Sequence, residues 1–266
     1  MKDLKNKKII ITGANGGIGS LVAKLLAKEK ANLILMSSNE ETLQKLCQEI
    51  KTDHDKVSYI IADFSNIRSI QETCEIIAEI DDIYMIINLS GISNFNSLGL
   101  QTNSQIEKLF NINLIAPIML TKALLPEMIK NKAGHIVTMG SIFGSIAFPY
   151  FSTYSSSKAG LRTFSESLQR ELEGSGVKVS YIAPRAVKTN INKGKVAEFL
   201  KRSKSNVDDP ELIAKKIIKA IKDEKKISYF GFPESLFVRL NYLFPSLVSR
   251  GIKAQTNIAR EILINN

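Results

Sequence analysis

Short apolar runs alternate with longer amphipathic stretches along most of this chain. The apolar runs predict seven strands, over 8–12, 33–36, 57–62, 83–89, 135–139, 177–183 and 226–230. Apolar residues that recur every three to four positions predict helices over 19–29, 40–50, 67–80, 103–113, 114–131, 152–173 and 210–222. Near-continuous apolar strands that alternate with helices are typical of a parallel sheet covered on both faces. We therefore expect an α/β fold: a single doubly wound domain with a parallel sheet of about seven strands.

Two segments depart from this alternation. Residues 190–209 are polar and basic, and we expect a mobile insertion there before the next helix. Residues 231–266 follow the last strand, and we interpret them as an amphipathic, basic C-terminal extension of a 1–230 domain, not as an independent domain. Within this extension, Pro245 predicts a break between two helices.

The extension has several possible uses. Its apolar stripe is flanked by Arg239, Arg250, Lys253 and Arg260, so it can lie on an anionic membrane as a peripheral contact. It can also cover a substrate cleft or pack against a partner subunit. Docking on its own domain or on a dimer mate is the most ordinary use of such a helix. If the stripe lines a cleft, we expect an apolar substrate such as an acyl chain, a polyketide, an isoprenoid or a steroid.

Positive charge is concentrated in the C-terminal third. The 266 residues include 36 Lys and Arg against 26 Asp and Glu, and residues 185–266 hold seventeen of the basic residues but eight of the acidic ones. Such a region attracts phosphates, anionic substrates, lipid headgroups or nucleic acid, although a solvated lysine-rich surface is the simpler explanation. Because no aromatic–basic platform accompanies the charge, we expect no nucleic-acid partner.

Composition and cysteine usage exclude several classes of protein. With 44% hydrophobic residues the chain is neither disordered nor collagen-like. Cys47 and Cys74 cannot build a disulfide framework, and with His54 and His135 as its histidines we expect no metal site. The N-terminal residues do not resemble a signal peptide, and no uninterrupted apolar run is long enough to span a bilayer. We expect a cytoplasmic protein, with peripheral membrane contact as the alternative.

A glycine-rich turn joins the first predicted strand to the first predicted helix. It reads Thr12-Gly13-Ala14-Asn15-Gly16-Gly17-Ile18-Gly19. Gly13 permits a sharp turn, Gly17 lets the backbone approach a pyrophosphate, and Gly19 lets the helix pack close to the strand. The helix N-terminus then presents free N–H groups to an anion. Because a strand precedes the turn and a helix follows it, the turn predicts a dinucleotide site.

A tyrosine and a lysine share one face of a later predicted helix. Tyr154 follows Ser141 by 13 residues, and Lys158 follows Tyr154 by four. An ammonium group near a phenol lowers the phenol pKa from its usual value of about 10, which suits proton exchange near neutral pH. Taken alone, such a pair is also common on solvated helices.

Together these motifs resemble the compact branch of the short-chain dehydrogenase/reductase family. The spacing Gly13-x3-Gly17-x-Gly19, the segment Asn88-Leu89-Ser90-Gly91 and the pair Tyr154-x3-Lys158 match that family in order, over about residues 5–230. The resemblance implies a Rossmann-type fold and an oxidoreductase that interconverts a carbonyl and a secondary alcohol by hydride transfer with a nicotinamide cofactor. It also implies a substrate loop at about 190–209 and a homodimer or homotetramer.

The resemblance assigns roles to four catalytic residues. Tyr154 acts as the general acid/base, and Ser141 orients the carbonyl oxygen. Lys158 holds the nicotinamide ribose and keeps the phenol acidic, while Asn113 anchors a water that connects Lys158 to solvent. Without the family, Ser141 is equally a loop hydroxyl that satisfies backbone groups, and Asn113 a helix-end cap. The expected cofactor contacts are Gly13, Asn15, Gly16, Gly17, Ile18, Gly19, Ser37, Ser38, Asp63, Phe64, Asn88, Ser90, Gly91, Tyr154, Lys158, Pro184, Arg185, Val187 and Thr189.

The end of the second strand bears on the choice of nicotinamide cofactor. An acidic residue there would bind the ribose 2′-OH and repel a 2′-phosphate, but the run is Leu35-Met36-Ser37-Ser38-Asn39. The arginine of many NADP-preferring members is missing too. Because the hydroxyls of Ser37 and Ser38 are able to bind a phosphate, we expect NADP(H), with NAD(H) as the alternative.

The chain departs from the family pattern after the sixth strand. Arg185 follows Pro184, where the family usually has glycine. Arg185 either turns away to pair with an acid or faces the cofactor phosphates or an anionic substrate. A different class of function, a nucleotide-sensing regulatory or scaffold protein with a basic partner-binding tail, remains as an alternative. The complete set of Asn113, Ser141, Tyr154 and Lys158 argues against it.

Overall fold

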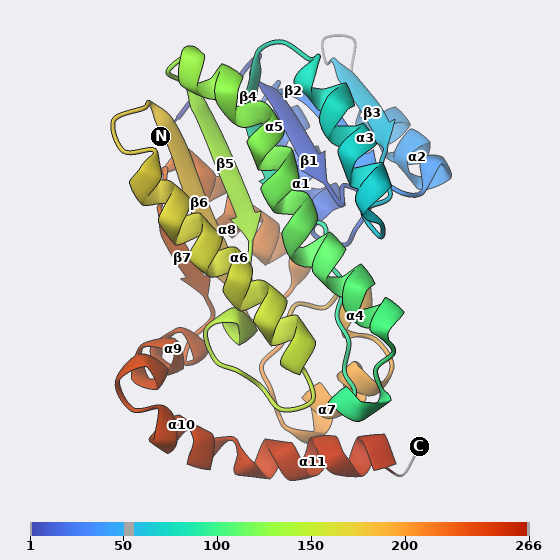
Figure 1. The fold of residues 1–266 in the computed structure, drawn as a ribbon, viewed down its shortest axis with the longest axis vertical. Helices are drawn as coiled ribbons and strands as arrows, with labels where there is room; N and C mark the ends of the chain where they lie inside the picture. The colour runs from blue at the N-terminus through green and yellow to red at the C-terminus, as the bar shows by residue number, and fades with distance from the viewer. Residues whose placement is uncertain (1, 51–55, 265–266) are drawn as a thin grey trace.

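The protein is built around one seven-stranded parallel sheet (Figure 1). The computed structural model describes residues 2–50 and 56–264. The strands are β1 (Lys8–Thr12), β2 (Asn32–Ser37), β3 (Val57–Ile61), β4 (Ile83–Asn88), β5 (Gly134–Met139), β6 (Val177–Pro184) and β7 (Ile227–Phe230), in the order β3-β2-β1-β4-β5-β6-β7. All neighbours pair in parallel, as the apolar, helix-separated strands predicted. The doubly wound α/β prediction is confirmed.

Helices cover both faces of the sheet. They are α1 (Gly19–Lys28), α2 (Glu40–Ile50), α3 (Ile67–Ala78), α4 (Asn103–Phe110), α5 (Ala116–Lys130), α6 (Ser152–Glu171) and α8 (Pro210–Lys222). Alternate residues of β1 face opposite cores, as a strand requires. Ile9 and Ile11 pack with α1, α2 and α8, whereas Ile10 packs with α3, α5 and α6. The fold therefore has three layers, with the sheet between two layers of helices.

The chain reverses its winding direction between β1 and β4. From β1 it runs outward to β2 and β3, then returns to β4 on the other side of β1 and continues outward to β7. In such sheets the crevice beyond the carboxyl ends of the strands, at this switch point, is where ligands bind. The ends of β1 and β4 are tied together there, because Thr12 Oγ1 accepts hydrogen bonds from the backbone N–H groups of Leu89 and Ser90, both at 3.1 Å.

Helices α4 and α5 are joined without an interruption of the helical path. The two helices predicted over 103–113 and 114–131 are instead α4, a π-helical turn η2 (Asn111–Ile115) and α5. By length and composition alone the stretch Asn103–Lys130 is apolar enough to cross a membrane, which the sequence analysis did not anticipate. In the fold it is a core helix, because Leu120, Leu124 and Met128 are buried in the core that also contains α3 and the sheet.

The expected mobile insertion at 190–209 is largely ordered secondary structure. It contains a short 3₁₀ turn, η4 (Asn190–Asn192), and a helix, α7 (Lys195–Arg202). Phe199 and Leu200 are buried there, with exposures of 1% and 8%. The prediction failed because the apolar partners of α7 lie far away in the sequence, in the C-terminal extension and among the aromatic residues Phe95, Phe148 and Phe151.

The C-terminal extension forms three helices across the carboxyl end of the sheet (Figure 1). These are α9 (Glu234–Leu243), α10 (Pro245–Gly251) and α11 (Lys253–Ile264). The predicted break at Pro245 is present, and a second break follows Gly251. Val238 of α9 is buried against Ile142 and Ile146, and Ala259 and Ile262 of α11 are buried with Phe199. The extension therefore docks on its own domain and covers the switch-point end of the sheet.

Candidate active site

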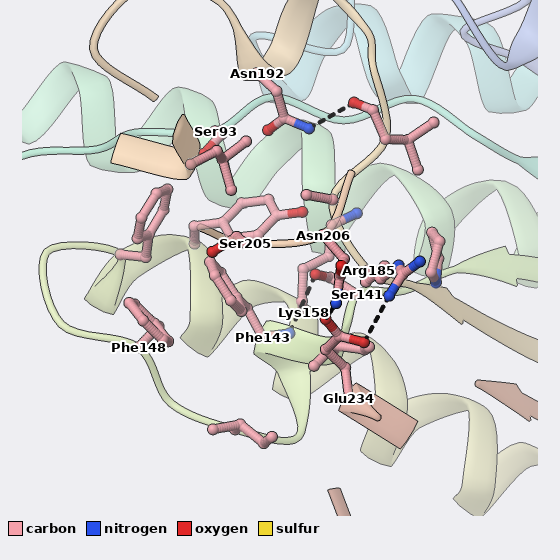
Figure 2. Close-up of a pocket in the computed structure, with 18 of the residues that line it drawn as sticks. Ser93, Ser141, Phe143, Phe148, Lys158, Arg185, Asn192, Ser205, Asn206 and Glu234 are labelled. Carbon is pink, nitrogen blue, oxygen red and sulfur yellow. Dashed lines mark hydrogen bonds and ion pairs between the residues drawn. The ribbon is translucent and has the colours of Figure 1, made fainter. Parts of the chain in front are cut away.

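A cavity of about 650 Å³ lies beyond the carboxyl ends of the strands (Figure 2). Its walls combine the glycine turn, the segments after β4, β5 and β6, helix α7 and the extension. Tyr154, Lys158 and Ser141 all line it, together with Gly91 and Thr189. Residues that are far apart in the sequence thus meet around one space, as their positions after successive strands require.

The glycine turn is tightly enclosed and suits a pyrophosphate. Gly13 has a φ of 63°, and a Cβ built there would lie 2.9 Å from backbone atoms of Ser90. A Cβ at Gly19 would lie 2.1 Å from the Gly13 carbonyl oxygen, and one at Gly17 would lie 2.9 Å from Thr189 Cγ2. Helix α1 begins at this point without a side-chain cap, so its first N–H groups point at the turn. These residues fit the phosphates of a dinucleotide.

The remaining predicted cofactor contacts differ in how far their side chains are exposed to a ligand. Ser38 and Asp63 are exposed at the ends of β2 and β3, and Ser37 is nearly buried. Asp63 accepts a hydrogen bond at 2.9 Å from the backbone N–H of Ser65, so it also stabilises its own turn. Phe64 is 5% exposed within the core beside α3, so its side chain serves packing.

Two further residues of the predicted site depart from their expected roles. Asn15 is exposed, and its side chain donates to Thr42 Oγ1 at 2.9 Å. Asn88, an expected cofactor contact, is buried at the end of β4, and both polar atoms of its side chain lack a hydrogen-bond partner among the described residues.

Asn113, Lys158 and Gly91 meet at one point. A Cβ built at Gly91 would lie 3.3 Å from Lys158 Nζ and 3.4 Å from Asn113 Oδ1. Asn113 is fully buried in the π-helical turn η2, where its side chain accepts from Ile92 N and donates to Ile92 O, both at 2.9 Å. It also donates to Ser157 Oγ at 3.1 Å. Asn113 is thus not a helix-end cap, because it fixes the loop after β4 against α6.

Lys158 is a buried cation. It is 4% exposed, and its Nζ donates to the Met139 carbonyl oxygen at 3.0 Å. Burial lowers the pKa of Lys158 to about 8, because the charged form loses its hydration. The ammonium lies 6.0 Å from the centre of the Tyr154 ring.

The net direction of the Tyr154 pKa in this structure is set by burial, which acts opposite to the effect expected of Lys158. Burial raises the pKa of Tyr154 above its usual 10, and a hydrogen bond with the Ser141 side chain opposes that shift. Ser141 is also the N-cap of a 3₁₀ turn, η3 (Ile142–Gly144), where its hydroxyl accepts from Phe143 N at 3.1 Å. The Ser141 hydroxyl therefore accepts a hydrogen bond from the backbone and also contacts the Tyr154 phenol.

The comparison with known protein families decides the identity of this arrangement. The sequence profile of the short chain dehydrogenase family matches residues 7–199. The chain belongs to this family. It is 30% identical over 270 residues to estradiol 17-beta-dehydrogenase 11 of Macaca fascicularis, covering 99% of this chain and 87% of the relative. It is 31% identical over 235 residues to the ketoacyl reductase HetN of Nostoc sp., covering 84% of this chain and 78% of the relative.

A solved structure supports the same fold. A metagenomic short-chain oxidoreductase in complex with NADP superposes with a TM-score of 0.71 at 26% identity. The alignment covers 86% of this chain and 97% of that one. As a short-chain dehydrogenase, the chain is an oxidoreductase that acts on a small-molecule substrate.

Arg185, which replaces the usual glycine of this family, joins three segments. Its guanidinium pairs with Asp208 at 2.7 Å and donates to Phe232 O at 3.0 Å. It also pairs with Glu234 at 2.9 Å, the contact drawn in Figure 2. These partners raise the pKa of Arg185. The arginine therefore pairs with acids, the simpler of its two expected roles. It connects the end of β6 with the end of the 190–209 segment and the start of α9.

A cluster of aromatic rings forms the apolar wall of the cavity. Helix α7 lies within the expected substrate loop of 190–209, and its Phe199 packs within 5.3 Å of Phe95 and 5.7 Å of Phe148, measured between ring centres. Phe143 stacks on Phe148 at 4.8 Å and meets Tyr154 edge-on at 6.5 Å. The signal that could have revealed α7 is the spacing of Val196, Phe199 and Leu200 at i, i+3 and i+4.

Proposed function

We propose that this chain is an NAD(P)(H)-dependent oxidoreductase that interconverts a carbonyl and a secondary alcohol. The observation that carries the proposal is the shared cavity: Tyr154, Ser141 and Lys158 line one largely apolar space that also reaches the uncapped N-terminus of α1 through Ile18. A bound nicotinamide supplies the hydride to the substrate carbon in reduction and accepts it in oxidation.

The chain's own residues handle the proton and the orientation. In reduction, the Tyr154 hydroxyl donates its proton to the substrate oxygen as charge develops there. Burial keeps the phenol protonated at neutral pH, which suits this direction. Ser141 holds the same oxygen by a hydrogen bond. Lys158 contacts the cofactor ribose, and Asn113 positions Gly91 and Ile92 beside it through its three hydrogen bonds. In oxidation, Tyr154 accepts the proton.

The cofactor contacts proposed here are the glycine turn with Asn15, Ile18, Ser37 and Ser38, and the residues that follow β3, β4 and β6. We favour NADP(H) over NAD(H), because no carboxylate at the end of β2 would repel a 2′-phosphate and Ser38 is exposed there. The solved neighbours include complexes with NADP and with NAD, so they support a nicotinamide cofactor but not the choice between the two. Arg185 does not contribute to it, because its charge is already neutralised by Asp208 and Glu234.

We infer an apolar substrate of moderate size. The aromatic cluster and the inner sides of α9 and α10 form much of the cavity wall, and 650 Å³ is sufficient for a molecule with several rings or a folded acyl chain. The names of the relatives, an estradiol dehydrogenase and a ketoacyl reductase, fit the same chemical class. A homodimer or homotetramer and a cytoplasmic location stay predictions.

The proposal is tested by titrating the purified protein with NADPH and NADH and following cofactor fluorescence. We expect NADPH to bind more tightly. Gly17→Asp should abolish binding, because the new side chain meets Thr189 and adds a negative charge where phosphate would lie. Tyr154→Phe should bind cofactor nearly as well but lose about a thousandfold or more in the rate of carbonyl reduction, since the proton donor is gone.

Gly174→Asp is the matched control, because the space around Gly174 is open and the residue lies away from the cavity. Its φ of 82° will cost some stability, so folding of both variants is checked by thermal unfolding. A folded wild-type protein that binds neither cofactor would refute the proposal.

A further inference from the structure

The outer surface of α9 and α10 is apolar to an unusual degree. Of the seventeen large apolar side chains that are exposed in the described part of the chain, seven fall within residues 232–247. They are Phe232, Leu236, Phe237, Tyr242, Leu243, Phe244 and Leu247. Phe232 is 75% exposed and Leu243 is 70% exposed. We call these seven residues the α9–α10 patch. Such a concentration of exposed apolar side chains in one short segment indicates a contact surface rather than ordinary solvent-facing residues.

The same two helices also carry apolar side chains that face the domain and the cavity. Val238 is buried against Ile142 and Ile146, and Leu240 and Val248 line the cavity. A helix that is apolar on both sides is stable only when both sides are covered. The extension thus separates the cavity from an outer apolar environment by a single layer of helix.

The cavity reaches the surface through this layer. Phe237 and Leu247 line the cavity and are also 45% and 59% exposed, so they form part of its rim. They belong to the α9–α10 patch. A molecule that crosses this rim therefore passes directly between the cavity and whatever medium covers the patch.

The charges around the patch favour an anionic partner. Arg239, Arg250 and Lys253 are exposed and form no salt bridge with any residue that the structure describes. The two acidic residues of the extension do not offset them, because Glu234 pairs with Arg185 and Glu261 with Arg202. Apolar side chains bordered by unpaired cations match the boundary between anionic headgroups and acyl chains.

A second copy of the chain fits the patch less well. A two-fold contact would bring the same cations of both copies together, with no free carboxylate on the extension to receive them. A flat lipid surface provides both the apolar depth and the negative charge that the patch lacks.

We propose that the α9–α10 patch docks this protein on an anionic lipid surface and that apolar substrate enters the cavity from the lipid, across Phe237 and Leu247. The docking part stands on the patch and its charges. The entry part rests on the function proposed above.

The docking is tested on the full-length protein by co-sedimentation with vesicles of phosphatidylcholine alone or of phosphatidylcholine mixed with phosphatidylglycerol. No cofactor or substrate is added, so the result does not depend on the proposed activity. We expect binding to the mixed vesicles that weakens as salt is added. The variant Arg239→Gln/Arg250→Gln/Lys253→Gln should bind about 100-fold more weakly, since each charge near an anionic surface contributes about fivefold.

The variant Phe232→Ser/Leu243→Ser/Phe244→Ser should also lose binding, by about 100-fold or more, because the side chains that enter the acyl boundary are gone. These positions are exposed and lie outside the cavity lining, so NADPH affinity should be unchanged. The controls are Ile61→Ser/Ile76→Ser, two exposed apolar residues elsewhere, and Lys28→Gln/Lys130→Gln/Lys215→Gln. Both controls should bind as the wild type does.

Three outcomes would overturn the docking: no vesicle binding by the wild type, equal loss in the control variants, or a larger oligomer in solution that the serine variant dissociates without any vesicle binding. Substrate entry has a separate readout. With an apolar ketone dissolved in the mixed vesicles, the serine variant should lose kcat/KM, while kcat/KM for a water-soluble ketone stays unchanged. Equal loss for both ketones would refute entry from the lipid and leave the docking result standing.

Discussion

Lys158 shows how a single residue serves the site at the expense of the fold. Its folded-state pKa of about 8 lies below the ordinary value of 10.5, because burial disfavours the charged form. Between pH 8 and 10.5 the unfolded chain therefore binds more protons than the folded chain, and stability rises with pH across that window. Below pH 8 both states carry the proton, and the full cost of burying the charge is present.

Replacing this lysine should therefore stabilise the protein at neutral pH. The shift corresponds to about 3 kcal/mol, and loss of the hydrogen bond to Met139 O costs about 1 kcal/mol. We expect Lys158→Met to raise the free energy of unfolding by about 2 kcal/mol at pH 7 and by little at pH 10. Urea titrations at both pH values measure this. The exposed Lys130→Met serves as the control, and equal destabilisation by Lys158→Met at both pH values would contradict the explanation.

At the level of elements, the sequence predicted the sheet and the helices that flank it almost completely. The strands are continuous apolar runs, so β1 to β7 were each placed within about two residues. The glycine turn, Tyr154 and Lys158 could be assigned to one site because their local spacing carries the chemistry. The sequence could not reveal that Tyr154 is buried strongly enough to raise its pKa, because that depends on Phe143 and Phe151 packing around it.

Elements that depend on distant partners were the ones missed. Helix α7 is stabilised by the packing of Phe199 and Leu200 against α11, and the sequence of 190–209 alone does not predict those contacts. The π-helical turn at Asn111–Ile115 has no periodic signature, because it is set by the bonds of Asn113 to Ile92 and Ser157. Such features need the assembled fold before they are visible.

The α7–α11 contact makes a prediction about this element. Phe199→Ala removes the ring that joins Phe95, Phe148 and Phe151, and deletion of a buried phenylalanine costs about 3 kcal/mol or more. Because the contact is local, we expect faster hydrogen exchange in 195–202 and 253–264, with little change in β1 and β4. Leu100→Ala, at a residue 69% exposed, is the control. Uniform loss of protection across the sheet would contradict a local role.

At the scale of the whole molecule, the Arg185 cluster ties the sheet to everything that covers its carboxyl end. Arg185 is 18% exposed, and its partners Asp208 and Glu234 are 9% and 24% exposed, so this network is shielded more than the surface pairs elsewhere. Loss of the arginine leaves two half-buried carboxylates without a cation, which is more costly than loss of a surface pair.

We expect Arg185→Met to loosen the 190–209 segment and the extension together. Limited proteolysis should then cut both regions several times faster, while the 1–184 core stays resistant. The control is Arg68→Met, which removes an exposed pair with Glu72. Faster cleavage in one region alone would show that the 190–209 segment and the extension are held in place independently.

The same cluster limits how this protein can be engineered. A glycine in place of Arg185, as the family usually has, leaves no side chain to pair with Asp208 and Glu234. The Gly231 backbone also packs closely on the arginine, because a Cβ built at Gly231 would lie 2.5 Å from Arg185 Cδ. Replacing the substrate loop or the extension with that of a relative would therefore leave Arg185, Asp208 or Glu234 without its charged partner. Chimeras that exchange residues 185, 208, 231 and 234 as one unit are the ones that should fold, and substrate range is best redesigned across that whole unit rather than loop by loop.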